Sequence, residues 1–134
     1  MNMSVAQYRL LMKSAPKGMQ KYRNRPVVVG NERYRSEKEY KFHTQCQVQT
    51  KAKDPHQRIV KIEREVYYQL VPSQRNADGS SERAMGYFLD FRLTYADGRL
   101  EHVDVKSPAT RRLALYVAKR KLMLERHGIQ IHEL

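Results

Sequence analysis

Two aspartates and a lysine stand inside stretches whose pattern predicts β-strands. Asp90 lies in FLDFRLTY, while Asp104 and Lys106 lie in HVDVKS, and a short Asp-Gly turn separates the two stretches. From Tyr87 to Tyr95 apolar and polar residues alternate, which is typical of a strand with one buried face. Asp90 belongs to the set that points away from the main apolar face. Packing of that face therefore does not explain it.

The turn between the two strands determines which residues meet. A three-residue loop, with Gly98 in the left-handed conformation, pairs Phe91 with Val103. The same register sets Asp90 opposite Asp104. A two-residue Asp-Gly loop would instead place the apolar residues of the two strands on opposite faces, so the three-residue loop is preferred. Like charges about 5 Å apart on opposed positions are destabilising, so the two carboxylates need a cation.

A solvated hairpin face is the simpler interpretation of the same residues. On such a face Asp90 would pair with Arg92 or Lys106 and do nothing else. Lys106 also lies two residues after Asp104 on the same side of the strand, about 6.6 Å away. It is therefore within reach of anything bound between the carboxylates. The hairpin alone leaves both interpretations open.

Composition and charge limit the class of protein. The chain has 134 residues, enough for one domain with a hydrophobic core. Its 26 Lys and Arg against 14 Asp and Glu give a formal net charge of +12, which favours a polyanionic partner such as nucleic acid. The single cysteine excludes an internal disulfide and suits a reducing cytoplasm. No apolar run resembles a membrane span or a secretory signal, so we expect no membrane partner.

The remaining patterns predict further elements around the central hairpin. Ser36 and Glu39 form an S-x-x-E pattern that opens a helix, and Ser107 followed by Pro108 opens a second helix that Gly128 closes. In order, we expect a hairpin over 27–35, a helix ending before Asp54, a long strand or strand pair over 58–72, a polar loop over 73–83, the central hairpin, the second helix, and a short strand over 129–131.

The domain is expected to begin at Pro26, after a basic N-terminal extension over residues 1–25. Within the extension, VAQYRLLMK predicts a short helix with one apolar face that packs on the domain or on a second copy of the chain. The following KGMQKYRNR carries Lys21, Arg23 and Arg25, which either contact phosphates or belong to a soluble tail.

The second helix carries a row of basic residues. Arg112, Lys119 and Arg126 are seven residues apart and fall within about 40° of one another on a helical projection. The opposite side, which we expect to face the core, carries Leu113, Val117 and Leu124. Basic rows are most often solvated faces. Because this row follows Lys106 closely, it is, together with Arg111, a candidate DNA-binding surface.

These residues together resemble the PD-(D/E)xK nuclease superfamily. More closely, the chain from about Lys21 to its C-terminus resembles a small group of phage and prophage endonucleases related to Holliday-junction resolvases. The matching stretches are KYRNRPV, RYRSEKEYKF, RIVKIEREVYYQLVP, FLDFRL, VDVKS and YVAKRKLM. The resemblance implies an α/β fold with a restriction-endonuclease-like core: a helix, three antiparallel strands, a helix and a strand, in a nuclease domain over 26–134.

The resemblance also assigns catalytic positions. Asp90 fills the first acidic position, and Asp104-Val105-Lys106 fills the (D/E)xK triplet. Glu39 fits the helical glutamate that precedes them. The implied catalytic residues are therefore Glu39, Asp90, Asp104 and Lys106.

Two positions depart from the motif, and one assignment has alternatives. Leu89 stands where the motif name has proline, and Asp104 replaces the commoner glutamate. Glu39 could serve as a helix cap alone, with Glu37 and Glu63 as weaker substitutes for it.

The implied cofactor is Mg²⁺ or Mn²⁺. Asp90, Asp104, the carbonyl of Val105 and Glu39 would supply the oxygen ligands that these ions prefer. Lys106 would orient the attacking water or stabilise charge on the phosphate. The resemblance thus implies a metal-dependent endonuclease that hydrolyses DNA, branched or linear, in the cytoplasm, which is that of the bacterial host for a phage protein. The alternative is a basic nucleic-acid-binding protein that cuts nothing.

Other residues receive structural roles. His43 and His102 are expected to be structural or surface histidines, and the tyrosines of KIEREVYYQL to lie in the sheet core rather than to stack on a ligand. Two symmetric cuts in a four-way junction would suit a homodimer, for which the N-terminal extension is the candidate contact.

Overall fold

The computed structural model describes residues 25–134. The predicted N-terminal helix and two of the predicted phosphate contacts, Lys21 and Arg23, lie outside these residues. Within them, no helix is long and apolar enough to span a membrane.

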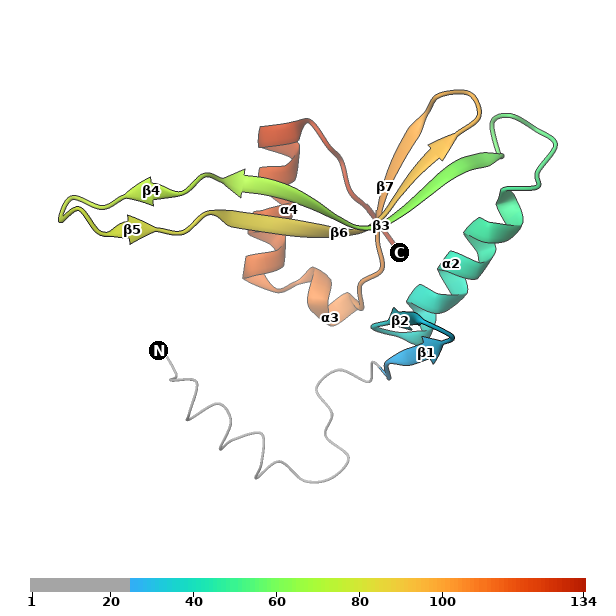
Figure 1. The fold of residues 1–134 in the computed structure, drawn as a ribbon, viewed down its shortest axis with the longest axis horizontal. Helices are drawn as coiled ribbons and strands as arrows, with labels where there is room; N and C mark the ends of the chain where they lie inside the picture. The colour runs from blue at the N-terminus through green and yellow to red at the C-terminus, as the bar shows by residue number, and fades with distance from the viewer. Residues whose placement is uncertain (1–24) are drawn as a thin grey trace, which may run out of the picture. The chain divides into compact units, whose positions relative to one another are not determined.

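Eight strands and three helices are described (Figure 1). In chain order they are β1 (Val27–Val29), β2 (Glu32–Tyr34), α2 (Glu37–Gln49), β3 (Ile59–Val71), β4 (Gln74–Arg75), β5 (Ser81–Glu82), β6 (Met85–Tyr95), β7 (Leu100–Asp104), α3 (Pro108–Arg111), α4 (Ala114–His127) and β8 (His132–Glu133).

The largest sheet has the strand order β3-β6-β7-β8. β3 pairs antiparallel with β6, β6 pairs antiparallel with β7, and β8 runs parallel to β7. The protein therefore has a mixed α/β fold with a mostly antiparallel sheet, and at this level the predicted α/β class is confirmed.

The chain divides into two compact units between Glu37 and Lys38. The domain start at Pro26 stays a prediction. The first unit contains the predicted small hairpin, in which Val27 of β1 pairs with Tyr34 of β2. The second unit contains α2 from Lys38 onward and every later element, including the four-stranded sheet.

The central hairpin has the predicted register. The Tyr95 amide donates to the Arg99 carbonyl at 2.9 Å, and the Gly98 amide donates to the Tyr95 carbonyl at 2.9 Å. Gly98 has φ 90°, a left-handed conformation that glycine adopts without a steric penalty. Phe91 pairs with Val103. The three-residue loop is therefore confirmed.

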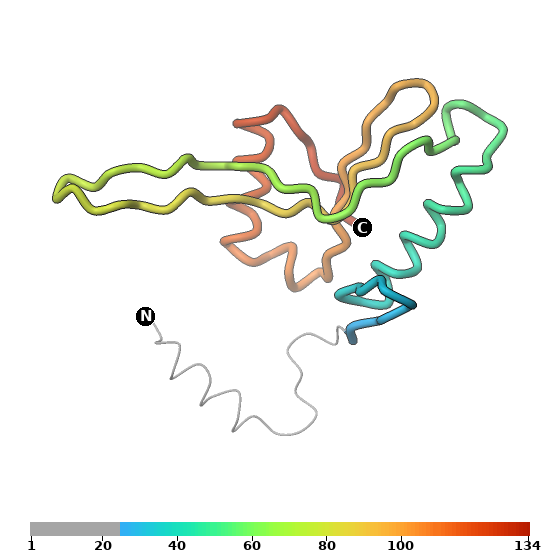
Figure 2. The backbone as a smooth tube through the Cα atoms, viewed as in Figure 1, coloured from blue at the N-terminus to red at the C-terminus, as the bar shows by residue number. Residues whose placement is uncertain are grey.

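The segment predicted as a polar loop over 73–83 is instead part of a hairpin arm. β3 and β6 continue past the sheet as a two-stranded ribbon that ends in β4 and β5 (Figure 2). Gln74 pairs with Glu82, and the Asn76 amide donates to the Ser80 carbonyl at 2.8 Å. Residues 72–84 are all exposed. The segment is polar and exposed as predicted, but polar composition does not distinguish a loop from an exposed ribbon.

The β3–β6 ribbon bends in its middle (Figure 2). Glu65 has φ 52° and is the one non-glycine residue with positive φ among the described residues. Arg64 pairs with Phe91 and Val66 pairs with Leu89, so the register continues across this position and Glu65 lies opposite Asp90. A left-handed residue inside a strand is strained and turns the chain locally.

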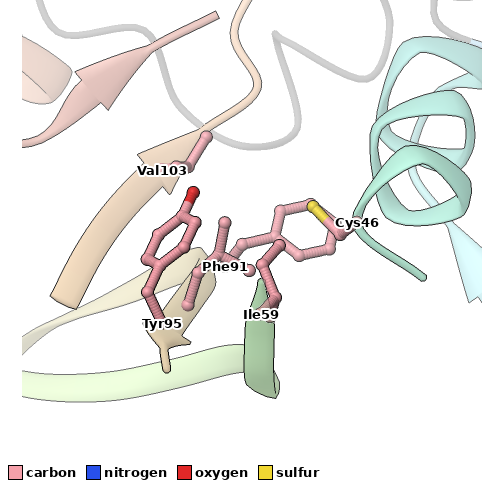
Figure 3. Packing of buried hydrophobic residues seen from close by; sticks show 6 residues of the cluster. Cys46, Ile59, Phe91, Tyr95 and Val103 are labelled. Atoms are coloured by element: carbon pink, nitrogen blue, oxygen red, sulfur yellow. The ribbon is translucent and has the colours of Figure 1, made fainter. Parts of the chain in front are cut away.

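The two halves of the ribbon contribute to separate hydrophobic clusters. One cluster joins α2 to the sheet through Cys46, Ile59, Phe91, Leu93, Tyr95 and Val103 (Figure 3). The other joins α4 to the sheet through Leu70, Tyr87, Leu89, Tyr116, Met123 and Ile131. Leu89 and Phe91, two residues apart on β6, thus pack against different helices. The bend lies between them, opposite Asp90.

The predicted second helix is interrupted. It begins as expected, because the Ser107 hydroxyl accepts from the Thr110 amide at 3.2 Å, and it ends at Gly128 in the left-handed conformation. Between α3 and α4, however, Leu113 is extended, with φ −64° and ψ 128°. A projection that assumes one continuous helix from Arg112 therefore does not hold.

The core-facing side of α4 also differs from the prediction. Tyr116 and Met123 are buried, whereas Leu113 and Leu124 are exposed. The reason is the interruption: α4 restarts after Leu113 and turns a different side toward the sheet. Leu113, Val117 and Leu124 are therefore not the core stripe.

Burial of Cys46 yields a first prediction. Burial raises the pKa of its thiol to about 12, and the charge of Glu101 acts in the same direction. Native protein at pH 8 should react with a thiol reagent roughly a hundredfold or more slowly than protein in denaturant, since reaction requires α2 to open. In the control Cys46→Ala/Val48→Cys, the thiol moves to an exposed position on the same helix and should react at once. Equal rates for native and denatured wild type would contradict the packing of α2.

A cross-strand ion pair in the ribbon yields a prediction for pH. Glu63 pairs with Arg92 through both carboxylate oxygens, with 3.0 Å between Arg92 Nη2 and Glu63 Oε1. The Arg92 hydrogen bond lowers the pKa of Glu63 from 4.5 to about 2. The pair should thus stabilise the fold fully above pH 4.5, and this contribution should fade as the pH falls toward 2.

Denaturant unfolding at several pH values measures this contribution. The free energy of unfolding of Glu63→Gln should differ most from that of the wild type at neutral pH and converge with it near pH 2. Glu125→Gln, an exposed substitution on α4, should show no such convergence. A difference that stays constant from pH 7 to pH 2 would rule out the ion pair as its source.

Candidate active site

Asp90 and Asp104 meet where β6 and β7 end their pairing. Their relative exposures are 3% and 0%. The Asp90 amide donates to Asp104 Oδ1 at 3.1 Å, and the Val105 amide donates to Asp90 Oδ2 at 2.9 Å. Each carboxylate thus accepts a backbone hydrogen bond from the neighbouring strand. The face is not solvated, because both carboxylates are buried, but Asp90 does pair with Lys106 as the simpler interpretation expected.

Lys106 supplies the cation that the opposed carboxylates require. Its Nζ donates to Asp90 Oδ2 at 3.2 Å and lies 4.0 Å from Asp104 Oδ1. The lysine side chain is 16% exposed, so three charged groups share a largely buried site. Burying charges costs free energy even when they are paired, and such sites are more frequent where chemistry requires them.

The C-terminal segment holds this triplet from the other side. The Leu134 amide donates to the Asp104 carbonyl at 2.9 Å, and the Lys106 amide donates to the Leu134 carbonyl at 3.3 Å. Strand β8 is therefore a structural part of the site. β7 ends at Asp104, and the two hydrogen bonds to Leu134 hold the chain on either side of Val105 as it leaves the strand.

A second charged group surrounds Glu133, which pairs with Asp104 in register. Its carboxylate accepts from Arg120 Nη1 at 2.7 Å and lies 3.6 Å from Arg111 Nε. The sequence interpretation assigned no role to Glu133 or Arg120, since no local pattern links them to the triplet. Arg111, a predicted DNA contact, is placed in this ion-pair group.

Tyr116 is buried near the same charges. Burial raises the pKa of its hydroxyl, and the charges of Asp104 and Glu133 raise it further. The phenol is thus kept neutral next to the carboxylates. No sequence pattern indicated this placement, because Tyr116 belongs neither to the predicted core side of the helix nor to its predicted basic row.

Glu39 does not join the two aspartates in one group. It is buried on α2, and its Oε1 accepts from Arg64 Nη2 at 3.2 Å. Among residues 25–134, no three His, Cys, Asp or Glu side chains form a group that could hold a metal ion. Glu63, a predicted substitute for Glu39, is paired with Arg92.

The two histidines have structural surroundings. His43 is buried, with its ring centroid 5.7 Å from that of Phe91. His102 lies half-buried opposite Arg92, and burial, with the Arg92 charge, lowers its pKa. These placements agree with the structural roles expected for them.

The predicted basic row is not continuous. Arg112 lies in the interruption between α3 and α4, Lys119 is half-buried on α4, and Arg126 is exposed near the end of α4. Arg25, the remaining described member of the predicted N-terminal contacts, is exposed.

The adjacent tyrosines of β3 have different surroundings. Tyr68 is half-buried, and its hydroxyl accepts from Arg92 Nη1 at 2.9 Å. Tyr67 is exposed and pairs with the exposed Phe88 of β6. The expectation that these tyrosines form sheet core is therefore wrong for Tyr67. The signal available in the sequence was strand alternation: adjacent strand residues such as Tyr67 and Tyr68 point to opposite faces, and Phe88 belongs to the set of Asp90, away from the main apolar face.

Comparison with known proteins adds a family but no activity. A search of curated proteins and a search of solved structures both find no match. A family model described as "Protein of unknown function (DUF1064)" matches residues 19–132, a span that includes Asp90, Asp104 and Lys106. The match covers most of the chain, and the protein therefore belongs to the DUF1064 family.

Proposed function

We propose that this protein is a metal-dependent endonuclease that hydrolyses DNA phosphodiester bonds. The observation that carries the proposal is the largely buried cluster of Asp90 on β6, Asp104 at the end of β7 and Lys106 just beyond it. A net charge of +12 favours a polyanionic substrate. The resemblance of the same three residues to the PD-(D/E)xK motif supports hydrolysis of that polyanion.

The donor set at the cluster fits Mg²⁺ or Mn²⁺. Asp90 and Asp104 offer carboxylate oxygens, and Val105 between Asp104 and Lys106 offers a carbonyl. Mg²⁺ is usually held by one or two protein carboxylates, with waters and substrate phosphate completing its shell. A third carboxylate from Glu39 is therefore not required. When bound, such an ion supplies a Lewis acid for the phosphate and a more acidic water.

The protein's own groups are arranged in advance of any substrate. Asp90 is oriented by the Val105 amide and Asp104 by the Asp90 amide, so neither carboxylate needs to reorganise. Lys106 is held 3.2 Å from Asp90 Oδ2, where its ammonium can donate to a phosphate oxygen or orient the attacking water. Preorganised charge of this kind is worth more as negative charge builds in the transition state.

A DNA-binding protein without catalytic activity is the second candidate. Its support is the ion pairing itself, since Lys106 already neutralises part of the carboxylate charge. In that case the cluster would only join β6 to the end of β7. The two candidates make opposite predictions for cleavage.

Cleavage of defined DNA separates these candidates. Purified protein should cut labelled four-way junction, flap, duplex or single-stranded DNA with Mg²⁺ or Mn²⁺ and should cut none of them in EDTA. Asp104→Asn should abolish cleavage, while the surface control Glu125→Gln should retain it. Light scattering on the same samples tests the homodimer that two symmetric cuts in a junction would require. Binding of all substrates without metal-dependent cleavage of any would favour the non-catalytic candidate.

Lys106 should act in the transition state rather than in binding. Lys106→Ala is expected to lower the cleavage rate at saturating DNA by about a hundredfold to a thousandfold and to keep most of the DNA affinity. Lys121→Ala, which removes an exposed lysine of α4, should leave that rate unchanged. Thermal melts of both variants should accompany the assay. A folded Lys106→Ala protein with a wild-type rate would remove the lysine from the mechanism.

A further inference from the structure

Two aromatic rings lie exposed on the β3–β6 ribbon. Tyr67 of β3 and Phe88 of β6 are register partners, and their relative exposures are 51% and 55%. Their ring centroids are 5.2 Å apart, with the planes tilted by 55°. At this tilt neither ring lies flat on the other, so both retain open surface. An exposed aromatic pair on a highly charged protein is a candidate binding surface.

The pair lies beside the candidate active site. Phe88 precedes Asp90 by two residues on one strand, so both side chains point to the same side of the ribbon, about 6.6 Å apart along it. Tyr87 and Leu89 are buried on the other side. The aromatic pair therefore occupies the ribbon position next to the carboxylates.

Gly86 allows the Tyr67 ring to lie against the ribbon. A Cβ atom at Gly86 would lie 2.1 Å from Tyr67 Cε2, so with a larger residue at this position the Tyr67 ring would have to shift. The absent side chain thus leaves room for the ring along the strand surface.

We propose that Tyr67 and Phe88 form a stacking surface for an unpaired nucleobase of the substrate, next to the phosphate bound at Asp90, Asp104 and Lys106. The inference rests on the proposed nuclease function and names its substrate class: DNA with an unpaired or displaced nucleotide near the cut. Aromatic side chains stack on unpaired bases whatever their sequence. In an intact duplex the neighbouring base pairs already cover the faces of each base.

Distance and charge agree with this occupant. The separation of about 6.6 Å along the strand corresponds to about two base steps of 3.4 Å. Lys106 lies 3.2 Å from Asp90 Oδ2 and 4.0 Å from Asp104 Oδ1, so the cation beside the carboxylates is on the β7 side. The phosphate therefore lies toward Lys106 on the β7 side, and the base lies over the ribbon. The net charge of +12 favours a nucleic acid over an uncharged apolar partner.

Binding in EDTA tests the stacking surface without requiring cleavage. The probes are a duplex with one unpaired 2-aminopurine and the same duplex fully paired, with affinity and 2-aminopurine fluorescence measured against full-length protein. Wild type should bind the unpaired probe more tightly and quench its fluorescence. Phe88→Ala should lose about fivefold or more in affinity for that probe and little for the paired duplex.

Matched variants separate stacking from simple apolar contact. Phe88→Trp should keep the affinity and the quenching, while Phe88→Leu, which keeps apolar area but has no ring, should lose both. Leu100→Ala, at an exposed apolar position on β7, should behave as wild type. Tyr67→Ala repeats the test if Phe88→Ala does not fold.

Three results would overturn the inference. The first is an equal loss of affinity by Phe88→Ala on both probes, and the second is a Phe88→Leu protein that binds as wild type. The third is a wild-type dimer that Phe88→Ala dissociates in light scattering, which would assign the rings to a contact between copies. Stacking without metal-dependent cleavage would refute the nuclease and keep the surface. Metal-dependent cleavage that Phe88→Ala leaves unchanged on both probes would keep the nuclease and refute the stacking surface.

Discussion

The Asp90 carboxylate is the interaction on which the site depends. Its Oδ2 accepts from the Val105 amide and from Lys106 Nζ, so one side chain joins β6 to the chain leaving β7. The Asp90 amide in turn donates to Asp104. Without this connection the strands would separate here with two buried carboxylates close together. Asp90 thus connects the end of the β6–β7 pairing to the buried charges.

The bend of the ribbon explains how a small sheet serves two helices. Glu65, opposite Asp90, has a left-handed backbone, and on either side of it the ribbon packs against α4 or α2. Leu89 and Phe91 therefore enter different clusters while Asp90 remains between them. The carboxylate site lies where the two hydrophobic clusters adjoin. Packing on both sides can hold this position rigid enough for chemistry.

Buried charge and exposed aromatic surface are both unfavourable for stability alone. The Asp90, Asp104 and Lys106 cluster loses hydration that its ion pairs only partly replace. Tyr67 and Phe88 leave apolar rings in water, and Phe88 is two residues from Asp90. A phosphate beside a stacked base would use both features at once. That combination is why we favour an enzyme acting on nucleic acid over a purely structural ion-pair cluster.

The sequence by itself determined the central hairpin, because strand alternation and the Asp-Gly turn are local signals that also set Asp90 beside Asp104. It also determined both ends of the α3–α4 segment, because the capping residues Ser107 and Gly128 are local signals too. Only the tertiary structure decided the interruption at Leu113, the burial of the carboxylates and the pairing of Glu133 with two arginines. These depend on contacts between segments distant in sequence, and a helical projection from Arg112 could not find the buried side of α4 once the helix is interrupted at Leu113.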